Sequence, residues 1–367
     1  MADKHEKYLD HHGGRMIEPL QLKGNETVAR MVDEVYARSG FNGRRLAEAC
    51  HLYAHMLQEN TTVALTIAGA MTPIGMSGPI MALIEAGFVD VIISTGANLY
   101  HDMHRPFGFP VFQGHFAVDD NELAAEGIAR IYDTYIRDEE TLMATDKIIL
   151  RAAGRLERNR PISTAQMHYA LGQEILETAP HPEKSLVATA ARYAVPIYTS
   201  SPGDSSIAMN LIVPHVTEQP ILLDPLRDII ETTAVVYAAE KNGVVEIGGG
   251  SPKNFYLQTQ PTLWQILGDE SKKGHDYFIQ FTTDAPHWGG LSGATPQEAK
   301  SWGKVKDALI NNVVVYSDAS ITFPILCQYA LMKSTPREPK RLFGKMPEIV
   351  DDMIRNVPAF TEYAKRM

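Results

Sequence analysis

The sequence predicts an α/β fold, a doubly wound, mostly parallel sheet with helices on both faces. Short runs rich in β-branched residues recur along the chain, each followed by small or turn-forming residues and then by a helix-like segment. Because parallel strands need a crossover connection that is usually a helix, this alternation is typical of such sheets. The expected strands are 62–68, 89–94, 195–199, 220–223, 244–247, 277–283 and 313–317.

The helical patterns lie between these runs. The expected helices are 79–87, 121–137, 226–241 and 296–302. The segment 139–161 is polar and dense in charge, and we interpret it as an excursion within one domain. We therefore expect an N-terminal extension over 1–26 and a single domain over 27–367.

Composition limits the class of protein. The chain has 367 residues, a net charge of -10 and only two cysteines, Cys50 and Cys327. An acidic chain lacks the basic surface that nucleic-acid binding requires, and two cysteines do not make a disulfide framework. No stretch of about 18 apolar residues or signal-like N-terminus is visible. We expect a cytoplasmic protein that binds neither nucleic acid nor membrane.

A sequence pattern typical of a helix N-terminus precedes a candidate nucleophile, Lys304. Thr295 followed by Pro296 and then Glu298 fits a capping box, with Pro at the first helical position. Gly303 is suited to end the helix, so that Lys304 lies beyond the helix and need not point in the direction that the helical repeat would give it. Alone, this pattern also fits an amphipathic helix with a surface lysine.

Small and polar residues follow most of the expected strands. Since ligands bind beyond the carboxyl ends of parallel strands, these residues are candidates for holding a dinucleotide. Separately, the glycines could form a tight turn, and Asp204 or Asp318 could cap a helix. Neither a G-x-G-x-x-G fingerprint nor a P-loop is present. The residues by themselves indicate a nucleotide-dependent α/β enzyme. The candidates are Thr95, Gly96, Asp204, Gly248, Gly249, Gly250, Thr283, Asp318 and Ala319.

The motifs taken together resemble the deoxyhypusine synthase family over roughly residues 27 to 330. The most specific part is Ser301-Trp302-Gly303-Lys304, preceded by Ser292-Gly293-Ala294 and by Glu298-Ala299. The other matching motifs are Ser39-Gly40-Phe41, Val89-Asp90-Val91, Gly114-His115-Phe116, Asn121-Glu122-Leu123, Gly127-Ile128, Asp204, Gly248-Gly249-Gly250 with Lys253, Tyr316 and Asp318-Ala319-Ser320.

The resemblance implies NAD as cofactor and a lysine as carrier. In that family NAD oxidises spermidine, the resulting imine passes its aminobutyl group to an enzyme lysine, and an acceptor amine receives the group. The family lysine falls on Lys304, which must be neutral to attack. Trp302 would supply a cation–π face, and Glu298 would pair with a substrate amine. Lys253 carries over as an active-site lysine, with a phosphate-binding or surface lysine as the alternative.

The substrate pocket departs from the family. Met209, Trp288 and Leu291 stand where the family has acids around the polyamine, and Asn254 replaces a histidine. Loss of charge partners predicts that spermidine does not bind in the usual way. His101 would contact substrate; with His104 it could form half a metal site, but no third ligand is evident and we expect no metal.

These departures leave several functions open. Our first interpretation is transfer between small amines, similar to homospermidine synthesis. The alternatives are a deoxyhypusine synthase that modifies a lysine of a translation factor, NAD-dependent oxidation or hydrolysis of another amine or guanidine such as agmatine, and a non-catalytic nucleotide-binding regulator. The resemblance also implies a homotetramer with active sites at subunit interfaces.

Overall fold

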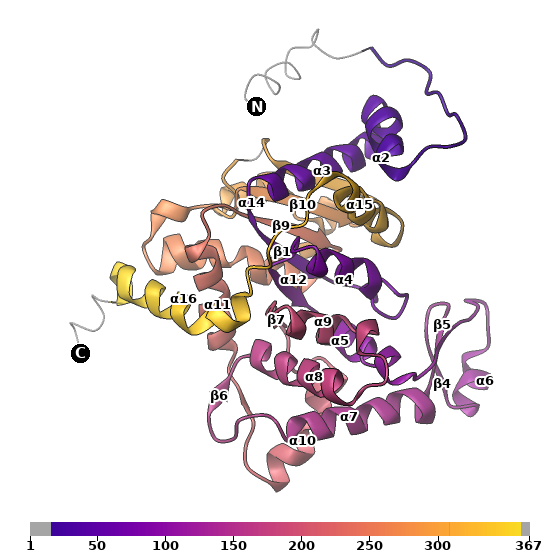
Figure 1. Cartoon of the computed structure of the whole chain (residues 1–367), viewed down its shortest axis with the longest axis vertical. Coiled ribbons are helices and arrows are strands. Elements are labelled where there is room, and N and C mark those ends of the chain that lie inside the picture. The colour runs from indigo at the N-terminus through magenta and orange to yellow at the C-terminus, as the bar shows by residue number, and fades with distance from the viewer. Residues whose placement is uncertain (1–15, 308, 361–367) are drawn as a thin grey trace.

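The centre of the molecule is a parallel six-stranded sheet (Figure 1). The computed structural model describes residues 16–307 and 309–360. The spatial order of the strands is β11-β10-β9-β1-β2-β7. Their bounds are β1 Thr62–Ile67, β2 Val91–Ser94, β7 Ile197–Tyr198, β9 Asn242–Ile247, β10 Tyr277–Thr282 and β11 Asn312–Tyr316.

The chain enters this sheet in the middle. It forms β1, moves outward through β2 to β7, then returns to lay β9 against the free edge of β1 and continues outward through β10 to β11. Every one of these pairs is parallel, so all six carboxyl ends lie along one edge of the sheet. The predicted mostly parallel sheet with helices is confirmed.

Alternating side chains bury both faces of the sheet. Leu65, Ile247 and Phe281 belong to a core shared with α3 (Phe41–Gln58), α4 (Ser77–Glu85), α9 (Leu186–Arg192) and α15 (Ala319–Lys333). The other face, with Ala64, Val244 and Phe278, packs against α11 (Pro225–Ala238), α12 (Gly250–Leu257) and α16 (Leu342–Asn356). Helices cover both faces because both faces of the sheet are largely apolar.

A group of helices packs beyond the β7 end of the sheet, in the lower part of Figure 1. It comprises α5 (Gly96–Asp102), α7 (Ala144–Ala153), α8 (Thr164–Thr178) and α10 (Ser206–Thr217). Here β6 (Pro161–Ile162) and β8 (Leu222–Leu223) form a separate two-stranded sheet. The run predicted at 220–223 is therefore a strand, but it lies outside the central sheet.

The helix predicted over 121–137 is wrong. The helix α6 spans only Asp120–Ala125, and the chain then forms a hairpin of β4 (Ile128–Ile131) and β5 (Thr134–Arg137), completed by β3 (Val111–Gln113). Gly127, at φ 66°, ends the helix in a conformation that favours glycine. The residues after it are largely β-branched or aromatic and pair across a two-residue turn. The hairpin projects from the side of the molecule (Figure 1).

The segment 139–161, expected as a connection, is largely helical. A π-helical turn over Asp138–Met143 leads directly into α7, which buries Ile148, Ile149 and Ala152. The charged residues that suggested a loop lie on the solvent side of an amphipathic helix. The other predicted helices are present as α4, α11 and α14 (Pro296–Ser301). Within the described residues, no helix has the length and apolar character needed to cross a bilayer.

Candidate functional site

Backbone hydrogen bonds hold the loops at the carboxyl edge together. The amide of Thr95 donates to the carbonyl of Ile67, that of Ala68 to Ile247, and that of Gly248 to Phe281. On the next strand, Thr282 pairs with Tyr316. The residues after β1, β2, β9, β10 and β11 therefore lie side by side, as the sequence predicted.

Thr95, Gly96 and Asp204 meet at one end of this edge. Thr95 begins α5, and its Oγ1 accepts a 2.9 Å hydrogen bond from Asn98. A Cβ on Gly96 would lie 2.4 Å from the Cβ of Ser205, so only glycine permits this approach of α5 to the start of α10. Asp204 precedes that contact and is exposed. The structure thus joins two predicted segments that are distant in sequence.

The glycine turn sits at the middle of the edge. Gly248 and Gly250 have φ values of 72° and 57°. The amide of Gly250 donates a 3.0 Å hydrogen bond to Ser292 Oγ, and a Cβ on Gly249 would lie 2.4 Å from Ser292 Cα. Gln280 Nε2 donates to the carbonyls of both Gly248 and Ser292 at 2.8 Å. This buried glutamine, which the sequence analysis missed, fixes the turn to the loop before α14.

Asp318 and Thr283 lie toward the β11 end. Asp318 caps α15 by accepting a 2.7 Å hydrogen bond from the amide of Ser320, and its side chain stays exposed. Its cap role is one of the two alternatives left open by the sequence. Ala319, the first residue of the helix, is buried, and Thr283 is exposed.

Lys304 follows α14 as the motif predicted. Thr295 Oγ1 accepts from the amide of Glu298 at 3.2 Å, Pro296 is the first helical residue, and Gly303 has a φ of 69°. The reversal lets the amide of Lys304 donate to Ala299 at 2.9 Å.

The amine of Lys304 points back to α12. Its Nζ donates a 2.9 Å hydrogen bond to Asn254 Oδ1 and lies 5.9 Å from the ring centroid of Trp302. Burial lowers the pKa of the Lys304 ammonium, and the positive charge of Lys253 lowers it further, while Glu298 and Glu246 act in the opposite direction. The predicted catalytic residues Lys304, Trp302 and Glu298 are therefore brought together, with Asn254 as an added partner.

Lys253 is a buried residue rather than a surface lysine. Its Nζ donates to Gln280 Oε1 at 2.9 Å and to the carbonyl of Ala294 at 2.7 Å, and lies 3.7 Å from Glu246 Oε2. Burial lowers the pKa of Lys253 and raises the pKa of Glu246 to about 7. Sequence reasoning missed Glu246, although a carboxylate inside the apolar strand β9 was a signal that could have revealed it.

His101 belongs to a buried hydrogen-bonded chain. Its Nδ1 lies 2.9 Å from His104 Nε2, and His104 Nδ1 lies 2.7 Å from Thr145 Oγ1. Burial lowers the pKa of His101 to about 4 and that of His104 to about 3, so both rings are neutral at physiological pH. Throughout residues 16–307 and 309–360, no three His, Cys, Asp or Glu side chains form a group that could hold a metal ion.

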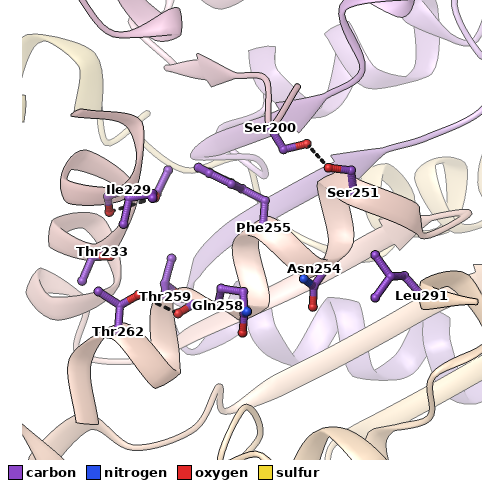
Figure 2. Close-up of a pocket in the computed structure, with 11 residues that line it drawn as sticks. Ser200, Ile229, Thr233, Ser251, Asn254, Phe255, Gln258, Thr259, Thr262 and Leu291 are labelled. Atoms are coloured by element: carbon purple, nitrogen blue, oxygen red, sulfur yellow. Dashed lines mark hydrogen bonds between the residues drawn. The ribbon is translucent and has the colours of Figure 1, made fainter. Parts of the chain in front are cut away.

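The predicted substrate residues lie on several different elements. Leu291 and Asn254 line a pocket of about 350 Å³ between α11 and α12, shown in Figure 2. Its lining is uncharged and rich in hydroxyl groups, with Ser200 and Ser251 in contact at 2.6 Å. Trp288 is 71% exposed on the loop before α14, whereas Met209 is 63% exposed on α10.

The chain is similar to known proteins over most of its length. The deoxyhypusine synthase family model matches residues 31–330. A deoxyhypusine synthase-like protein of Nostoc punctiforme is 43% identical over 350 residues, covering 93% of this chain and 89% of that protein. Probable deoxyhypusine synthase 2 of Methanosarcina acetivorans is 39% identical over 318 residues, covering 86% of this chain and 90% of that protein.

A solved structure agrees at the level of the fold. A crystal structure of a candidate deoxyhypusine synthase from Entamoeba histolytica superposes with a TM-score of 0.59 at 15% identity. The superposition covers 86% of this chain and 99% of the other.

Proposed function

Because the chain belongs to the deoxyhypusine synthase family, a family of transferases, we propose that it is an NAD-dependent alkylamine transferase that carries the transferred group on Lys304 as an imine. The observation that carries this proposal is the position of the Lys304 amine. It is half-buried, held by the neutral Asn254 side chain, and repelled by the charge of Lys253. Such surroundings favour the neutral amine that attack on an imine requires.

The residues at the carboxyl edge fit NAD. Numbered along the chain, the strands have the order 3-2-1-4-5-6, in which dinucleotides bind where the direction of winding reverses, here between β1 and β9. The glycine turn lies at that point, and the exposed Asp204, Thr283 and Asp318 offer oxygens for hydroxyl groups along the same edge. Bound NAD would accept a hydride from the carbon next to the amine nitrogen. We expect Thr95, Gly96, Asp204, Gly248, Gly249, Gly250, Thr283, Asp318 and Ala319 to hold it.

The chain's own residues would then perform the transfer. Lys304 Nζ adds to the imine carbon, and the original amine leaves with a proton, so the group becomes bound to the enzyme. Glu298, exposed at the start of α14, would pair with a substrate ammonium. Trp302 would cover one side of the resulting cation.

The acceptor separates two versions of this function. The names of the relatives favour the deoxyhypusine reaction, with a protein lysine as acceptor, over our first interpretation of a small-molecule acceptor. The small-amine alternative is supported by the apolar residues Met209, Trp288 and Leu291, which stand where the family acids would be. Both versions use the same carrier lysine.

A trapping experiment tests the carrier role. Borohydride added to the enzyme with NAD and spermidine, putrescine or agmatine should leave a reduced adduct on the Lys304 peptide, detected by mass spectrometry. Lys304→Arg should lose the adduct because guanidinium stays protonated, whereas Lys300→Arg on the exposed side of α14 should retain it. Full turnover by Lys304→Ala would exclude covalent transfer and favour direct oxidation or hydrolysis.

Product analysis then identifies the acceptor. Mass spectrometry of reactions with a lysine-bearing translation factor, and of parallel reactions with small amines only, distinguishes protein modification from homospermidine-like products. NAD bound without any turnover of the amine panel or the protein acceptor would favour the regulator alternative.

For assembly, we infer a homotetramer with active sites at subunit interfaces. The exposed apolar residues Met209, Ile212, Val213 and Val216 follow one another at helical spacing on α10. An apolar stripe of this kind commonly marks an interface. A cytoplasmic location remains a prediction.

A further inference from the structure

Glu246 is a fully buried carboxylate in the central strand β9. Its register partners are Thr66 on β1 and Gln280 on β10. Among the described residues, no hydrogen-bond donor reaches either oxygen of Glu246, and Thr66 Oγ1 is likewise without a partner. Burying an ionised carboxylate in this way is costly, so its charge state must depend closely on nearby charges.

The nearest opposite charge is held in a fixed place. The Lys253 ammonium has three N–H donors, and two of them donate to Gln280 Oε1 and to the carbonyl of Ala294. The third is available to Glu246 Oε2, which lies 3.7 Å from Nζ. Gln280 is itself anchored to the backbone of Gly248 and Ser292. These contacts hold the Lys253 amine in the interior, 3.7 Å from Glu246. Lys304 Nζ is hydrogen-bonded to Asn254, the next residue on α12, and the charge of Lys253 lowers the pKa of Lys304.

The charges that face Lys304 are few. They are Lys253 and Glu246 from the interior, and Glu298 from the exposed start of α14. Asp284 acts on Lys253, and His275, whose amide donates to the carbonyl of Lys304, has a pKa lowered by burial to about 3 and is neutral. Of the acidic groups in this set, Glu246 alone is fully buried.

We propose that Glu246 and Lys253 are positioning residues that control whether Lys304 carries a proton. When Lys304 becomes a free amine, Glu246 holds the proton as a neutral carboxylic acid, and the fixed Lys253 ammonium keeps Lys304 uncharged. The exchange converts one ammonium and one carboxylate into one amine and one acid, so it needs no outside base. It rests on the proposed role of Lys304 as nucleophile.

The directions of the pKa shifts agree with this exchange. Burial raises the pKa of Glu246 to about 7, while burial lowers the pKa of Lys304 from its usual value. The pKa values of Glu246 and Lys304 are thus moved toward each other, and the titrations of the two groups are coupled because the charge of each acts on the other. Burial also lowers the pKa of Lys253, while the charges of Glu246, Glu298 and Asp284 favour its ammonium form. A coupled pair loses its protons in two steps that belong to the pair.

Reductive methylation measures the free amine without NAD or an amine substrate. The full-length protein is treated with formaldehyde and cyanoborohydride between pH 6 and 10, and labelling of the Lys304 peptide is followed by mass spectrometry. Lys300, exposed on α14, provides an internal reference in each sample. The wild type should show a broad, two-step pH profile for Lys304.

Three variants are expected to change the pH midpoint of Lys304 labelling in different ways. Glu246→Gln should move the midpoint to lower pH by about one unit and make the profile a single step, because the anion that stabilises the ammonium is lost. Lys253→Met should move the midpoint to higher pH. The double variant Glu246→Gln with Lys253→Met leaves neither charge and should return the midpoint toward that of the wild type, with a single step.

The outcomes also separate this proposal from the proposed function. An unchanged Lys304 profile in folded Glu246→Gln would overturn the control by Glu246. If that variant does not fold, the uncharged double variant replaces it, and a two-step profile there would overturn the proposal equally. Failure to trap a substrate adduct would count against the transferase function while leaving the labelling result valid.

Discussion

The side chains of Lys304 and Asn254 join two motifs that lie fifty positions apart, through a 2.9 Å hydrogen bond from Nζ to Oδ1. Asn254 is on α12, which begins in the glycine turn, and Lys304 follows α14. The amide can accept from either the ammonium or the free amine without adding charge. This contact connects the expected cofactor edge with the expected nucleophile.

Asn254→Asp should therefore hold Lys304 in its protonated form. A carboxylate at hydrogen-bond distance raises the pKa of an ammonium, and labelling of Lys304 at pH 8 should slow about tenfold if that pKa rises by one. Gln258→Glu, at the C-cap of α12 one turn after Asn254, is the matched control and should have a much smaller effect. Equal slowing in both variants would contradict a local contact.

Gly249→Ala should disrupt the glycine turn. The added Cβ would meet the Cα of Ser292 at 2.4 Å, which the backbone must move to relieve. We expect a loss of about 1–3 kcal/mol in the free energy of unfolding, together with weaker NAD binding measured by calorimetry. Gly78→Ala on α4, where nothing lies within 4 Å of the new Cβ, should leave NAD binding unchanged. Unaltered stability and NAD binding in Gly249→Ala would contradict the close approach.

Arg337→Met should destabilise the fold. Arg337 Nη2 lies 2.8 Å from Asp90 Oδ2, and Nη1 donates to the carbonyl of Thr61 at 2.8 Å. Loss of Arg337 removes the ion-pair partner of the buried Asp90 carboxylate and leaves it the hydrogen bond from the amide of Val63. The expected loss is about 3–5 kcal/mol in urea unfolding. Adding Asp90→Asn should recover part of it. Lys345→Met, exposed on α16, is the control.

Acid should weaken the fold through buried neutral histidines. His168 Nδ1 donates to the carbonyl of Ile197 at 2.8 Å, and burial lowers the pKa of His168 to about 4. Between pH 6.5 and 4, His168 is therefore protonated in the unfolded chain but stays neutral in the folded chain. As the pH decreases through this range, this group should lower the free energy of unfolding by up to about 1.4 kcal/mol per pH unit.

The test compares urea unfolding at pH 7.5 and 5.5. His168→Gln should reduce the pH dependence, whereas His287→Gln at an exposed position should not. Glu246 and Asp228, whose pKa values are raised by burial to about 7, act in the opposite direction and make the total slope smaller than the histidines alone would give. The difference between His168→Gln and wild type isolates the one group, and equal slopes would refute its role.

Val213→Asp should weaken assembly. Val213 is 61% exposed in the apolar stripe of α10, and a buried carboxylate in an interface has no partner there. Light scattering should show a smaller species than wild type, while Lys345→Glu on α16 should not change the mass. A wild-type monomer would refute the inferred homotetramer, and an unchanged mass for Val213→Asp would place the interface elsewhere.

Local signals in the sequence predicted the strands and the surroundings of Lys304 well. The helix start at Thr295 and the reversal at Gly303 depend on neighbouring residues, so they could be read directly. The hairpin after Gly127 was missed because a helical pattern continued past the glycine that ends α6. Glu246 had a local signal, a carboxylate within an apolar strand, but its neighbours Thr66 and Gln280 come from the register across three strands. Gln280 was missed because no local pattern contains that register.

The return of the chain to the middle of the sheet has a consequence for synthesis on the ribosome. β1 is complete at residue 67, but its second neighbour, β9, begins at residue 242. Until β9 emerges, the nascent chain has an unpaired edge on its most central strand, where Val63, Leu65 and Ile67 are apolar. Such edges pair readily with other chains. A chain interrupted before residue 242 is therefore expected to aggregate rather than persist as a stable half.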